Sequence, residues 1–249
     1  MKKSKYILFL ALLMPLLLPL PAQAQSKNSA SVEIGKVIVS LIGPEGLSRV
    51  DGGNAKADAY IKTLEPKFKL RVLGLYADPG QWKAFVDDAS AGRPAAIPRF
   101  AMICVPAKMP RKSYDPAKMR KEFKKYDNWF SLAANNRVTA ALLTSQGNKK
   151  LKEYMGVDID FKFRSGDYSK KFSESSNSIS VGALVSFNVH KKASDVYLTV
   201  TSLGIGDKLV FLAYFENSGP PEKLAQIQAA SLMWRQRVSE LNAGQYRNK

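Results

Sequence analysis

The sequence has few of the residues that most often carry chemistry. Its 249 residues include one cysteine, Cys104, and one histidine, His190. A single cysteine cannot form a disulfide within the chain, and this one lies in the apolar run 100–105, which is typical of a buried thiol. His190 ends an alternating segment beside two lysines, where we expect a solvent-exposed side chain and not a metal ligand or triad base. We therefore predict no catalytic, cofactor-binding or metal-binding residues, and no cofactor.

Short catalytic motifs are also missing. No HExxH, GxSxG or CxxC pattern occurs, and the GxG at Gly204–Gly206 joins two predicted strands, so it cannot present a helix N-terminus to a phosphate. This favours a non-catalytic protein. An alternative is an uncharacterised hydrolase, since Asp158 and Asp160 share one face of an alternating strand at roughly 6–7 Å, close enough for acid–base work. We interpret the pair as part of a surface ladder of charges.

Long apolar runs are confined to the N-terminus. Three lysines precede the apolar segment 7–20, and the small-x-small sequence Ala22-Gln-Ala24 follows it. That order predicts a cleaved signal peptide at 1–24, and the apolar segment falls short of the ~20 residues of a spanning helix. We expect a bacterial periplasmic or secreted protein with no transmembrane segment after cleavage. Residues 25–249 then form a single exported α+β domain, with an ordered core at about 32–241.

Acidic residues are scarce. The chain has 38 lysines and arginines against 21 acidic residues, a formal charge of +17, of which the signal peptide holds three. Such a charge favours polyanionic partners. Outside the cytosol these are an acidic envelope protein or an anionic lipid or glycolipid, so we do not expect nucleic acid.

The basic residues are densest between 108 and 125, where eight stand against two acids. Asp115-Pro116 has the capping signature of a helix start. Met119, Phe123, Tyr126 and Phe130 then share one face of the predicted helix at 116–130. The other side carries the candidate binding residues, which are Lys118, Arg120, Lys121, Lys124 and Lys125. A purely solvated face is the alternative.

Elsewhere the sequence alternates between strand and helix patterns. We predict strands at 32–42, 68–77, 99–106 and 157–164 and a helix from Asp78-Pro79 that buries Trp82, Phe85, Val86 and Ala89. Residues 165–177 are polar, include five serines and predict an exposed loop; 242–249 predicts a frayed tail.

The C-terminal third has the most regular pattern. Strands are predicted at 179–190, 196–203 and 208–215, followed by a helix at 221–241. The first two strands have a polar face each, Ser180 to His190 and Tyr197 to Thr201. The predicted fold is α+β, with a central, mainly antiparallel sheet flanked by helices that ends in a strand meander and a C-terminal helix. We place any binding specificity on the polar strand faces and the basic helix.

One family resemblance rests on these segments. The chain resembles the PsbP-like superfamily, mainly over 181–241. The resemblance rests on the strand Lys208-Leu-Val-Phe-Leu-Ala-Tyr214, the proline-containing loop after it, the helix with Trp234 near its end, and the early Gly43-Pro-Glu-Gly46. The resemblance implies a sheet flanked by helices and a non-enzymatic binding or accessory role, with no catalytic residues to carry over.

The sequence therefore favours an exported periplasmic binding or accessory protein without catalysis, whose basic surface suits an acidic partner. A periplasmic hydrolase and a peripheral binder of anionic lipid or glycolipid remain the alternatives.

Overall fold

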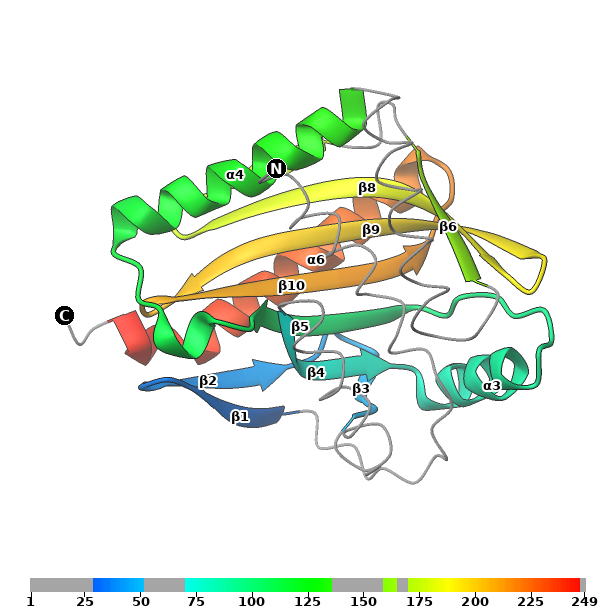
Figure 1. Cartoon of the computed structure of the whole chain (residues 1–249), viewed down its shortest axis with the longest axis horizontal. Helices are drawn as coiled ribbons and strands as arrows, with labels where there is room; N and C mark the ends of the chain where they lie inside the picture. Colours follow the sequence, from blue (N-terminus) through cyan, green and yellow to red (C-terminus); the bar gives the residue numbers. More distant parts are fainter. Residues whose placement is uncertain (1–28, 52–69, 136–158, 165–169, 247–249) are drawn as a thin grey trace.

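A computed structural model describes residues 29–51, 70–135, 159–164 and 170–246 of the chain (Figure 1). The predicted signal peptide lies outside these residues. The main sheet is antiparallel, with strand order β3-β4-β5-β10-β9-β8-β6, and β7 also pairs with β8. Its strands are β3 (Ser48–Arg49), β4 (Leu70–Ala77), β5 (Phe100–Pro106), β6 (Ile159–Arg164), β7 (Lys170–Glu174), β8 (Ser178–Val189), β9 (Lys192–Ile205) and β10 (Lys208–Asn217). The predicted α+β fold with an antiparallel sheet and a closing meander and helix is confirmed.

The predicted first strand is two strands. β1 (Ser29–Ile34) and β2 (Val37–Ile42) form an antiparallel hairpin of their own, separate from the main sheet. Gly35 and Lys36 make the two-residue turn, and Gly35 has a φ of +66°. A turn with positive φ at its first central residue favours glycine there. The single-strand prediction was wrong because one glycine within an apolar run is a weak break in the pattern.

Two helices cover opposite faces of the main sheet. α6 (Pro221–Leu241) packs against β9, β10 and β2 and runs behind the sheet in Figure 1. α4 (Pro116–Asn135) packs against β7, β8 and β9 along one margin. Two residues of β9 show that the helices lie on opposite faces. A side chain added at Gly204 would meet Met119 of α4, whereas Thr199 bonds to α6. Positions 199 and 204 are an odd number of residues apart, so their side chains point to opposite faces of the sheet. No described helix is long and apolar enough to cross a bilayer.

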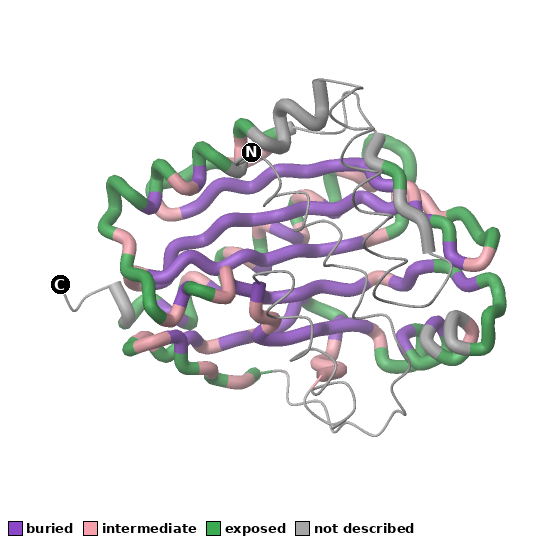
Figure 2. Tube along the Cα trace, viewed as in Figure 1, coloured by how far each residue is buried: buried purple, intermediate pink, exposed green. Residues whose placement is uncertain are grey.

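The polar strand faces are buried in part: Asn188 of β8 is exposed and Ser186 is half-buried, but the residues beneath α6 are covered. Ser180, Thr199 and Thr201 are fully buried, and Tyr197 is 1% exposed. α6 satisfies part of this face: Thr199 donates to the Oγ of Ser231 at 2.8 Å, and Gln228 donates to the Tyr197 hydroxyl at 2.9 Å. The sheet satisfies the rest, since the Ser180 and Thr201 hydroxyls are 2.7 Å apart. The prediction that these strand faces carry binding specificity was therefore wrong for the part beneath α6. Figure 2 shows buried residues along these strands.

Two further segments differ from the prediction. The supposed loop 165–177 contains β7, which adds to the β8 edge beside β6. Asn242, placed in a frayed tail, is 2% exposed and bonds both backbone groups of Ser40 in β2, at 2.8 and 2.9 Å. The short helix η3 (Ala243–Tyr246) follows it.

The far end of the sheet is closed by side chains. β3 pairs with only the last two residues of β4. The side chain of Arg49, the last residue of β3, donates to the carbonyl oxygen of Leu73 at 3.0 Å. Asp51, two residues later, accepts the backbone N–H of Leu75 at 2.7 Å. The Arg49–Asp51 ion pair, at 2.8 Å, holds both side chains in place. These contacts replace the ladder bonds that an exposed edge would offer to another strand.

The stripe of α3 (Pro79–Ser90) belongs to the core, as predicted for Trp82 and Phe85, which are each 3% exposed. Trp82 lies 6.0 Å from Phe100, whose ring stacks on Phe215 at 4.2 Å. The side chains of Val86 and Ala89 fall outside the described part. The same holds for the side chains of Tyr126 and Phe130 in α4.

Candidate functional site

α4 begins and orients as the sequence predicts. The Asp115 carboxylate accepts the backbone N–H of Lys118 at 2.8 Å, and this bond holds the pKa of Asp115 below its usual value. Met119 and Phe123 face inward and are 5% and 4% exposed. The five candidate binding residues consequently lie on the exposed side of the helix.

These five cations fall into two groups. Lys118 pairs with Asp115 at 3.0 Å, and Lys125 pairs with Glu122, both on the same helix. In the part of the chain that the structure describes, Arg120, Lys121 and Lys124 form no ion pair with a carboxylate. We call these three residues the free cations of α4. They are the part of the basic face whose charge is available to a partner.

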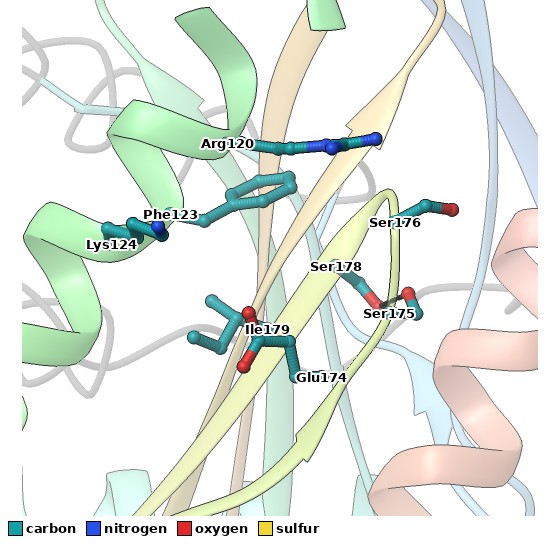
Figure 3. Close-up of a pocket in the computed structure, with 8 residues that line it drawn as sticks. All are labelled: Arg120, Phe123, Lys124, Glu174, Ser175, Ser176, Ser178 and Ile179. Atoms are coloured by element: carbon teal, nitrogen blue, oxygen red, sulfur yellow. Dashed lines mark hydrogen bonds between the residues drawn. The ribbon is translucent and has the colours of Figure 1, made fainter. Parts of the chain in front are cut away.

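Two of the free cations line a pocket. A hollow of about 330 Å³ lies between α4 and the turn that joins β7 to β8. It is lined by Arg120, Phe123, Lys124, Glu174, Ser175, Ser176, Ser178 and Ile179. In Figure 3, Arg120 and Phe123 extend from the helix toward the turn, and the serines stand on the opposite wall. Arg120, Lys124 and Ser176 are exposed, so the pocket opens to solvent.

A directional chain of hydrogen bonds fixes the serine wall. Arg235 of α6 donates to the hydroxyl oxygens of Ser173, at 3.1 Å, and Ser178, at 3.3 Å. The Ser178 hydroxyl lies 2.8 Å from that of Ser175, which donates to Asn177 at 2.9 Å. Because the Ser175 proton goes to Asn177, Ser178 must be the donor in its contact with Ser175. Among the described serines of this wall, Ser173 only accepts in the chain, and Ser176 takes no part in it.

The one acid of the pocket is neutralised by a neighbour. Lys171 bonds Glu174 at 2.7 Å and lies 3.5 Å from Asp127 of α4. The hydrogen bond from Lys171 lowers the pKa of Glu174, and the same contact raises the pKa of Lys171. Lys171 is thus shared between two carboxylates, and the charge of Lys124 also helps to lower the pKa of Glu174.

Sequence reasoning identified the cations of this site but missed its serine wall. The sequence predicts a loop at 165–177 and a strand from 179. The pocket forms only where the turn between β7 and β8 meets α4, about fifty residues earlier in the chain. The serine-rich segment between two alternating strands was the only available signal.

The remaining candidates lie elsewhere. Cys104 is fully buried in β5. His190 lies in the β8–β9 turn with a φ of +46°, and its side chain is half-buried and not exposed as expected. Asp158 and the side chain of Asp160 lie outside the described part of the chain. Within that part, no three His, Cys, Asp or Glu residues gather as metal ligands would.

Comparisons with known proteins add little. No family model matches the chain, and no curated protein matches it. Among solved structures, the Ran-binding protein Mog1p of Saccharomyces cerevisiae matches at 10% identity and a TM-score of 0.32, over 88% of this chain and 94% of that one.

Proposed function

We propose that the protein is an exported, non-catalytic binding or accessory protein that holds an acidic protein partner against the basic face of α4. The observation that carries the proposal is the group of three free cations on one exposed helix face. An ion pair already made within the helix gains little from a partner, whereas an unpaired cation steers and holds an acidic surface. The periplasm or the medium remains the proposed location.

The PsbP-like resemblance is proposed on the same terms. It draws on an early segment around Gly43 and on the closing helix with Trp234. Support comes from the bond between Trp234 and Ile42, which brings those two segments together. A non-enzymatic role is what that superfamily would imply.

The proposal is tested by capture in the native envelope. Full-length protein is exported, crosslinked and purified, and its bound proteins are compared with those of the triple variant Arg120→Gln/Lys121→Gln/Lys124→Gln. The matched control is Lys83→Gln/Lys118→Gln/Lys125→Gln, which removes the same charge from three lysines that are paired on exposed helices. Both variants are checked for an unchanged circular-dichroism spectrum and melting temperature.

We expect an acidic protein to be captured by the wild type and the control but lost from the free-cation variant. Capture should also weaken between low and physiological salt, because exposed charges are screened over about 8–10 Å. Equal capture by all three proteins, or equal loss from both variants, would reject the free cations as the contact.

A further inference from the structure

The pocket beside α4 has a charge and donor pattern of its own. Arg120 and Lys124 carry two positive charges at one wall, and Lys171 pairs with the single acid of the lining, Glu174. On the opposite wall, Ser175 and Ser178 bond to one another and to Asn177, and the Ser176 side chain points away from α4 (Figure 3). The pocket thus offers a guanidinium fork and an ammonium group to an anion.

We propose that this pocket binds a phosphate monoester group. A guanidinium donates to two oxygens of a phosphate at once, and an ammonium group adds a point charge. The monoester has three terminal oxygens and a charge of about −1.5 to −2 at pH 7. It can therefore meet both cations of the pocket, the guanidinium of Arg120 and the ammonium group of Lys124. The inference goes beyond the proposed function and does not depend on a protein partner.

Other anions fit less well. A carboxylate carries one charge and two oxygens, so either Arg120 or Lys124 would lose water without gaining an ionic partner. A phosphodiester has one charge and two unesterified oxygens, and it leaves the same deficit. Unmatched charged groups of this kind cost binding free energy.

The size of the pocket leaves room for the group esterified to the phosphate. Its volume of about 330 Å³ is at the lower end of small-molecule sites, which span about 300–1,000 Å³. Phe123 and Ile179 form the apolar part of the lining. The substituent can thus contact a ring and an aliphatic side chain while the phosphate meets the two cations.

Arg235 is a positioning residue for this site. It reaches Ser173 and Ser178 from α6 and holds the β7–β8 turn through their hydroxyls. These bonds hold Ser178, and with it the turn, in place opposite α4. Replacing Arg235 should weaken binding through the wall, without removing a charge that touches the ligand.

Calorimetric titration of the mature protein with phenyl phosphate tests the proposal, with phenyl methyl phosphate and benzoate as matched anions. We expect saturable binding of the monoester at least tenfold tighter than that of the diester or of benzoate. Arg120→Gln and Lys124→Gln should each weaken it at least tenfold. Lys121→Gln, which removes an equal charge from the same helix outside the pocket, should leave it within twofold.

The pH dependence gives an independent readout. The second ionisation of a phosphate monoester has a pKa near 6. Binding should therefore tighten from pH 5 to pH 7.5 for phenyl phosphate and stay level for the diester. No saturable binding, equal affinity for monoester and diester, or equal weakening by Lys121→Gln and Arg120→Gln would overturn the proposal.

Two sources of the monoester are distinguished by further arms. Competition by inorganic phosphate or glycerol 3-phosphate at equal affinity would identify a soluble ligand. Retention on phosphatidic acid vesicles but not on phosphatidylglycerol vesicles, reversed by phenyl phosphate, would identify a lipid-linked monoester. Either result supports the pocket. Failure of the proposed function is separate, because Lys121→Gln should reduce capture of an acidic protein while leaving phosphate binding intact.

Discussion

The indole N–H of Trp234 donates a 2.6 Å hydrogen bond to the carbonyl oxygen of Ile42, 192 residues earlier in the chain. Ile42 is the last residue of β2, whose hairpin is not part of the main sheet. Just past the end of α6, Asn242 continues the contact by pairing with both backbone groups of Ser40. The closing helix is thus a link between two sheets as well as a cover for one.

Removing the indole donor should loosen this link. Trp234 is 1% exposed and Ile42 is half-buried, so Trp234→Phe removes a buried donor and leaves the Ile42 carbonyl oxygen without this partner. We expect a loss of about 1–3 kcal/mol in the free energy of unfolding, measured by urea denaturation. Met233→Ala changes an exposed neighbour on the same helix and should stay within about 0.5 kcal/mol. Equal effects in the two variants would mean that the bond contributes nothing.

The β8–β9 turn contains local strain that can be relieved. His190 and Lys191 have φ values of +46° and +70° in a two-residue loop. Side chains other than glycine, asparagine and aspartate are disfavoured there. Lys191→Gly should therefore raise the melting temperature and stabilise the fold by about 1 kcal/mol. Lys192→Gly, one residue later in extended β9, should instead destabilise it by about 0.5–1 kcal/mol. The strain explanation fails if both substitutions act in the same direction.

Local signals predicted much of this fold because they depend on neighbouring residues. The two Asp-Pro pairs mark real helix starts: Asp78 accepts the N–H of Gln81 at 2.8 Å, just as Asp115 accepts that of Lys118. Period-two alternation located β8 to within one residue at each end. Lys118 and Lys125 each pair with an acidic residue three positions earlier in the chain, so these ion pairs too could be anticipated from the spacing.

The errors share a different cause. A polar strand face predicts solvent only if nothing polar covers it, and α6 brings Ser231 and Gln228 to Thr199 and Tyr197 from about thirty residues away. The pocket likewise needs a turn and a helix that meet only in the fold. No periodicity of a single segment contains such pairings, which is why the cations of α4 were predicted and the site beside them was not.

The buried hydroxyls beneath α6 offer a test of that account. Thr199→Val removes the donor to Ser231 and leaves the buried Ser231 oxygen without this bond. We expect the free energy of unfolding to fall by about 1–2 kcal/mol. Ser231→Ala removes the acceptor and should cost a similar amount. In the double variant no polar atom of the pair remains, so the combined loss should fall short of the sum by about 0.5–1.5 kcal/mol. Strict additivity in denaturant titrations would show that the pair is not coupled.

The Cys104 thiol should show its burial in two ways. Burial raises its pKa from 9.0 to about 12, because the thiolate would lie in the apolar interior. At pH 8 we expect reaction with an aromatic disulfide reagent to be slower in the native protein than in urea by a factor on the order of 100 or more, since the thiol must first be exposed by opening of the fold. A rapid native reaction would contradict the placement of Cys104 in β5.

The same shift has a consequence for stability at alkaline pH. As pH rises past 9, the unfolded thiol loses its proton while the folded one keeps it, so the unfolded state binds fewer protons and the free energy of unfolding falls. This contribution should amount to about 1 kcal/mol between pH 9 and pH 10 and should be missing from Cys104→Ala. Burial also raises the pKa values of Tyr76 and Tyr214, but unfolded tyrosines ionise near 10.0 and act mainly at higher pH. A steeper fall for the wild type than for Cys104→Ala in this interval would therefore come from the thiol, and parallel curves would exclude it.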